Sequence, residues 1–226
     1  MAPAPRDARR PATLRRSGRS APILPPFPAA FPVRILVRLT LWTWFLGALV
    51  VGRLELLARL PAWGLAGIPA GLILLLLAAG LGSRALRGWI ATLDLRLLVL
   101  LHAVRFYGVY CLVLYQRGTL TYALAVPGGW SDISVALLAL AAVFLPLREE
   151  LHRQAVIIWN TIGVTGLLLN AATAGRIGLA QPWQLDAFRR LPLSVLPTFL
   201  VPLLLATHVI IFARLLREPP ETARPA

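Results

Sequence analysis

The chain has 226 residues, of which 58% are hydrophobic and only 14% are charged. A soluble domain of this size carries about a quarter charged residues, so the apolar content exceeds what one globular core can hide from water. The formal charge of +14 comes from arginine alone, and the arginines lie mostly in short stretches between apolar runs. That pattern is more typical of the flanks of membrane helices than of a nucleic-acid-binding face, so we expect no nucleic-acid partner.

The first segment, residues 1–32, is rich in proline and arginine and has no helical apolar period. This composition predicts a disordered basic tail beside the membrane. The rest of the chain divides into an expected transmembrane helical domain at 33–217 and a short tail at 218–226. The single cysteine, Cys111, has no partner for an internal disulfide and no metal-ligand spacing around it.

Six apolar segments approach the length of about 20 residues that a helix needs to cross the hydrocarbon layer. In chain order they cover residues 35–51, 64–81, 97–116, 133–147, 155–174 and 193–216. The predicted fold class is therefore an all-α integral membrane bundle of about six transmembrane helices. With the N-terminus inside, the inner segments hold 16 arginines and the outer segments 6, with Arg105 left uncounted within a helix. This bias predicts that both termini are cytoplasmic.

Four polar side chains within the helices are candidates for a ligand-binding site, because polar groups are costly in hydrocarbon. His102 and Arg105 share one face of the third helix, Asn160 lies in the fifth and His208 in the sixth. A rise of about 1.5 Å per residue places the histidines and Asn160 in the inner leaflet, with Arg105 near the midplane. We therefore expect an inward-facing polar cluster between helices three, five and six.

Two further polar residues, Asp132 and Asn170, are predicted near the outer surface in structural roles. Asp132 ends the segment AVPGGWSD, which reads as a turn with Asp132 capping the fourth helix. On this interpretation no acidic residue shares the depth of Arg105. Helix two carries Gly67 and Gly71 in a GxxxG pattern, which permits close helix approach or dimerisation.

Several functions are compatible with this cluster. Arg105 near the midplane, with titratable histidines nearby, favours small-molecule or ion transport or binding. Alternatively, the polar groups only hold the bundle together, and the protein acts as a homo-oligomer or as a structural subunit of a membrane complex. A third hypothesis is a b-type haem held by His102 and His208, which lie at similar depth on different helices.

An enzyme is not expected. The sequence has no HExxH, GxSxG, P-loop, dinucleotide-binding or CxxC motif. His152, beside Glu149 and Glu150, is interpreted as part of a solvated loop. No catalytic residue and no metal site are therefore predicted.

From residue 97 to 216 the chain resembles a family of uncharacterised bacterial polytopic membrane proteins. The resemblance rests on the run Arg105-Phe106-Tyr107-Gly108, on AVPGGWSD, on Trp159-Asn160 with Gly163, and on LPLSVLPTFLVPLLLATH, which ends at His208. Where that family tends to carry an acidic residue after Trp-Asn-x-x-Gly, this chain has Gly166. The resemblance implies a multi-pass protein of the bacterial cytoplasmic (inner) membrane and draws attention to Arg105, Asp132, Asn160 and His208. It implies no reaction.

Overall fold

The structure, a computed structural model, describes residues 30–216, and it is built of helices without a strand in that range. Nearly all of the expected basic tail and the whole segment 218–226 lie outside the described residues. The α-helices are Ala30–Arg53 (α1), Ala62–Gly82 (α2), Arg84–Ala91 (α3), Leu95–Leu100 (α4), Tyr107–Gln116 (α5), Tyr122–Phe144 (α6), Glu149–Ala180 (α7) and Val201–Leu215 (α8). Shorter helical segments are η1 (Leu56–Arg59), η2 (Leu101–Phe106) and η3 (Pro182–Arg189), all 3₁₀, and the π-helical η4 (Leu196–Leu200).

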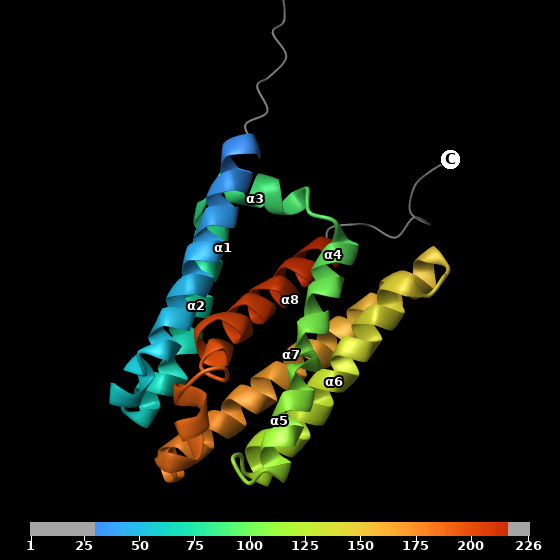
Figure 1. The fold of residues 1–226 in the computed structure, drawn as a ribbon. Helices are drawn as coiled ribbons and strands as arrows, with labels where there is room; N and C mark the ends of the chain where they lie inside the picture. The colour runs from blue at the N-terminus through green and yellow to red at the C-terminus, as the bar shows by residue number, and fades with distance from the viewer. Residues whose placement is uncertain (1–29, 217–226) are drawn as a thin grey trace, which may run out of the picture.

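Six helical segments within the described range are long and apolar enough to cross a membrane, which confirms the predicted fold class. They are Val33–Arg53, Trp63–Gly82, Leu95–Gln116, Tyr122–Phe144, Glu149–Ala180 and Leu196–Leu215. The third segment joins α4, η2 and α5 into one span, and the sixth joins η4 and α8. Both described ends of the chain lie at the same end of the bundle, as an even number of spans requires (Figure 1).

The fourth span differs most from the prediction. It was expected at 133–147, but α6 covers Tyr122–Phe144 and has Pro127 inside it. The predicted turn is helical because backbone N–H and C=O groups have no water to bond in the hydrocarbon layer, so an irregular segment there is costly. Asp132 therefore lies midway along α6 and is buried. The predictions that it caps a helix and lies near the outer surface were wrong.

The bundle has two parts (Figure 1). The spans α4–η2–α5, α6, α7 and η4–α8 pack closely around one another and contain most of the buried residues. The helices α1 and α2 form a hairpin against one side of this four-span core. α5 and α6 approach very closely, since a Cβ on Gly108 would lie 2.4 Å from the carbonyl oxygen of Gly129. This contact fixes Arg105 of the third span opposite Asp132 of the fourth.

Candidate functional site

The centre of the core is an ion pair between Arg105 of η2 and Asp132 of α6. Arg105 Nε donates to Asp132 Oδ1 at 2.8 Å, and Arg105 Nη2 lies 2.7 Å from the same oxygen. The guanidinium is fully buried and the carboxylate nearly so. The hydroxyl of Tyr107 also hydrogen-bonds this carboxylate. Each residue lies midway along its span, so the pair is placed near the middle of the apolar layer.

The other side of the guanidinium contacts α7 and α8. Arg105 Nη1 donates to the carbonyl of Gly163 at 3.0 Å and lies 3.5 Å from His208 Nε2. His208 Nδ1 lies 2.7 Å from Asn160 Oδ1, and Asn160 Nδ2 donates to the backbone carbonyl of His208 at 3.1 Å. A neutral His208 that carries its proton on Nδ1 satisfies all of these contacts, a tautomer assigned from the hydrogen-bond network.

His102 adds a second imidazole to the cluster. Its ring centroid lies 4.2 Å from that of His208 and 5.0 Å from the ring of Trp159. His102 Nε2 lies 3.1 Å from Thr207 Oγ1, and the Thr207 hydroxyl also donates to the carbonyl of Leu204 at 2.8 Å. Because the hydroxyl has a single proton, His102 Nε2–H is then the donor to Thr207. Among residues 30–216, no group hydrogen-bonds His102 Nδ1, which is left as a buried acceptor.

Local sequence features make room for this cluster. A Cβ on Gly163 would lie 2.5 Å from His208 Cε1, and one on Gly166 would lie 2.6 Å from Ser131 Oγ. These two glycines therefore let α7 approach both α8 and α6. On the third span, the chain winds as a 3₁₀-helix from Leu101 to Phe106, so His102 and Arg105 lie where the helix departs from α geometry. Such stretches within a helix often mark functional positions.

The structure brings together all four sequence-predicted residues of the polar cluster: His102, Arg105, Asn160 and His208. It adds Asp132, which the sequence analysis had placed at the surface. The only sequence signal for this partner was the general rule that an arginine within a membrane pairs with an acid. Because the fourth helix was predicted to begin too late, Asp132 was placed outside the depth of Arg105, and the rule could not be applied to it.

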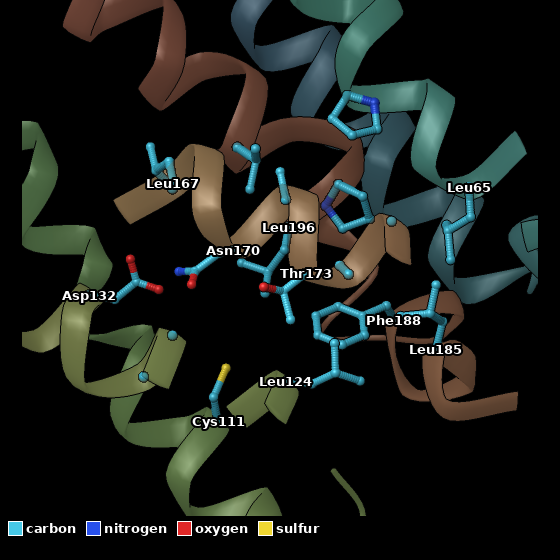
Figure 2. A pocket seen from close by; sticks show the side chains of 18 of the residues that line it. Leu65, Cys111, Leu124, Asp132, Leu167, Asn170, Thr173, Leu185, Phe188 and Leu196 are labelled. Atoms are coloured by element: carbon cyan, nitrogen blue, oxygen red, sulfur yellow. The ribbon is translucent and has the colours of Figure 1, made fainter. Parts of the chain in front are cut away.

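A cavity of about 140 Å³ extends from Asp132 toward the end of the bundle opposite the described chain ends. Figure 2 shows Asp132, Asn170, Thr173 and Cys111 pointing into one space from α6, α7 and α5. The cavity's remaining walls are mainly apolar and come from α2, α6, α7, η3, η4 and α8, with lining residues that include Leu65, Leu124, Leu185, Phe188, Leu196 and Val201. Asn170 thus faces a cavity, and the cavity lies toward the end of the bundle opposite the described chain ends, whereas the sequence analysis had expected the polar interior toward the chain ends.

The histidine pair does not fit a haem. Two axial imidazoles must stand on opposite faces of a porphyrin, but the rings of His102 and His208 are in contact, with centroids 4.2 Å apart. The haem hypothesis is therefore not supported by this geometry.

The fold and this site define a multi-pass helical membrane protein with a charged pair at the centre of its bundle. Residues 62–216 match a family described as "Domain of unknown function (DUF8737)", and the chain belongs to that family. The match begins at α2, whereas the sequence analysis had found a resemblance only from residue 97 onward. None of the curated proteins and none of the solved structures matches the chain.

Proposed function

We propose that the protein binds a small molecule within the membrane, as a transport or ligand-binding protein of a bacterial cytoplasmic membrane. The observation that carries this proposal is the cavity that ends on the Arg105–Asp132 pair, with further polar side chains directed into it. Pockets of this kind, mostly apolar with a few convergent polar groups, are the usual form of a small-molecule site.

The energetics of the ion pair support a functional role. Replacing a buried pair by well-packed apolar residues is often neutral or even stabilising, so a charged pair is a poor device for merely holding helices together. In hydrocarbon, ionisable residues mark ligand or ion pathways by default. Arg105 and Asp132 combine both features, since they are buried in the bundle and Asp132 lines the cavity.

Cys111 provides the experiment, because it is the chain's single cysteine and lines the cavity. A thiol in a cavity that water enters reacts with methyl methanethiosulfonate, a small neutral reagent, whereas a thiol in lipid does not form the reactive thiolate. We expect the native protein in nanodiscs to be modified at Cys111, as measured by intact mass. The matched control is Leu169→Cys in a Cys111→Ser background, since Leu169 is 62% exposed on the lipid-facing side of α7. Modification of Cys111 no faster than this control contradicts a binding cavity.

The distribution of arginines supports a proposed orientation of the cavity: eight lie at one end of the described bundle, and six, Arg53, Arg59, Arg117, Arg176, Arg189 and Arg190, lie at the other. Among the described residues, the end that carries α3 and the α6–α7 loop holds Arg34, Arg38, Arg84, Arg87, Arg96, Arg148, Arg153 and Arg214. We propose that this end faces the cytoplasm, which places the cavity in the periplasmic half. In a Cys111→Ser background, an impermeant maleimide added to intact cells should label Thr119→Cys but not Leu147→Cys. The reverse labelling would invert the proposed orientation.

A structural-subunit role is the second candidate, and one observation favours it. Gly67 and Gly71 of α2 face open space as far as the described residues are concerned, because none of their atoms lies within 4 Å of a Cβ built on either glycine. An outward-facing GxxxG surface permits close approach of another helix, such as α2 of a second copy. If this is the protein's role, Gly71→Leu should convert an oligomer to a monomer in light scattering of the detergent-solubilised protein. If light scattering shows that the native protein is already a monomer, self-association through this surface is contradicted.

A further inference from the structure

We infer that the cavity takes a small, uncharged amphiphile of about the size of phenol, with one hydrogen-bonding group on an apolar ring. This inference rests on the proposed function, because it names the ligand class of the same cavity. Three properties of the site carry it: charge, unpartnered polar groups and size.

The cavity carries no net charge. Among its lining residues Asp132 is the one acidic side chain, and no basic side chain lines it. The charge of Asp132 is balanced by Arg105, whose Nε and Nη2 both contact Asp132 Oδ1. An ionic ligand would therefore bring an unpaired charge into a low-dielectric site, at a cost that excludes it.

The polar groups in the cavity have hydrogen-bonding capacity to spare. Asn170 and Thr173 lie one turn apart on α7 and point toward Asp132 (Figure 2). Within the described part of the chain, neither side chain has a hydrogen bond to another protein group. A carboxamide and a hydroxyl side by side offer both donors and acceptors. They match a ligand hydroxyl, which both donates and accepts.

The size of the site limits the rest of the ligand. The cavity volume is about 140 Å³, close to that of an engineered apolar cavity of about 150 Å³ that binds benzene. Away from Asn170, Thr173 and the Asp132–Tyr107 pair, the walls are formed mainly by apolar side chains such as Leu124, Phe188 and Leu196. One six-membered ring therefore fills the apolar part, while its hydroxyl reaches α7.

Protection of Cys111 from methyl methanethiosulfonate tests the inference in the full-length protein in nanodiscs. The probes are phenol, toluene and benzoate, which share a ring and differ in the group attached to it. Phenol should slow the modification saturably, toluene should protect only at higher concentration, and ionised benzoate should not protect. Modification of the lipid-facing Leu169→Cys control should be unchanged by all three probes, which separates occupancy of the cavity from a general effect on the bilayer.

Thr173→Val is the matched variant, because valine keeps the volume and removes the hydroxyl. Loss of one buried hydrogen bond of about 1–1.5 kcal/mol corresponds to a rise of up to about tenfold in the phenol concentration that gives half protection. Protection by toluene should not change. Equal protection by toluene and phenol, or protection by benzoate, would overturn the inferred ligand class while leaving the cavity intact. A Cys111 that does not react at all would overturn the proposed function itself.

Discussion

The α1–α2 hairpin and the four-span core are both apolar enough to cross a membrane, yet they are buried to very different degrees. Only 11% of the α1 window and 6% of the α2 window are buried inside the protein, against 39% for Leu95–Gln116 and 44% for Leu196–Leu215. Other parts of the protein therefore cover little of the hairpin and considerably more of the core. Hydropathy therefore predicts which segments lie in the membrane, but it does not predict which of them form the centre of the bundle.

Polar side chains distinguish the two regions better than hydropathy does. The core holds the buried Arg105, Asp132, Asn160 and His208 in one hydrogen-bonded cluster. The hairpin contacts the core through apolar packing and through isolated polar contacts, such as the bond from Trp44 Nε1 to the carbonyl of Thr198 at 2.8 Å. The core should therefore be sensitive to single substitutions and the hairpin tolerant of them, which can be measured as free energies of unfolding in mixed SDS micelles.

The largest effect is expected for Asp132→Asn. Removing the carboxylate leaves the fully buried Arg105 guanidinium without its counterion, and breaking a buried pair in this way costs about 3–5 kcal/mol. The matched control is Arg117→Ala, in the exposed loop after α5, which should change the free energy of unfolding little. The double variant Arg105→Met with Asp132→Leu should recover most of the loss. A single Asp132→Asn variant as stable as the native protein would show that the pair does not hold the core.

A smaller loss is expected for Gly163→Ala. The added Cβ would lie 2.5 Å from His208 Cε1 and 3.3 Å from Arg105 Nη1, so α7 and α8 must separate, at a cost of about 1–3 kcal/mol. Gly47→Ala in α1 is the matched control, since no atom lies within 4 Å of a Cβ there. That control should leave stability unchanged or raise it by up to about 1 kcal/mol. Equal losses at the two positions would remove the distinction between core and hairpin.

The smallest effect is expected for Trp44→Phe. Phenylalanine retains a ring against Phe199, whose centroid lies 4.8 Å from that of Trp44, but loses the hydrogen bond to Thr198. The expected cost is about 0.5–1.5 kcal/mol, and it should appear as faster protease cleavage of the loop between α1 and α2 with Cys111 reactivity unchanged. A change in Cys111 reactivity would show that the position of the hairpin affects the cavity, whose walls include Leu65 and Pro69 of α2.

The sequence alone was sufficient for the membrane class, for four of the six spans with errors of at most three residues at an end, and for the convergence of His102, Arg105, Asn160 and His208. The fifth span was also recognised, but α7 extends six residues beyond the predicted segment at each end. These features depend on local composition and on helix geometry. The helical period determines which side chains share a face, and the rise per residue determines their depth along a span. The sequence was not sufficient for the start of α6, because Pro127, Gly128 and Gly129 have the composition of a turn in water. In a bilayer the need to satisfy backbone hydrogen bonds outweighs those local preferences.

Which side chains meet was decided by tertiary structure. The Arg105–Asp132 pair depends on the contact between Gly108 and Gly129, and the approach of His208 depends on Gly163. The cavity is a space left between spans, and no single segment encodes it. The length of an apolar segment determines whether it enters the membrane as a helix. Only the packing of the helices against one another determines which polar groups meet inside the bundle.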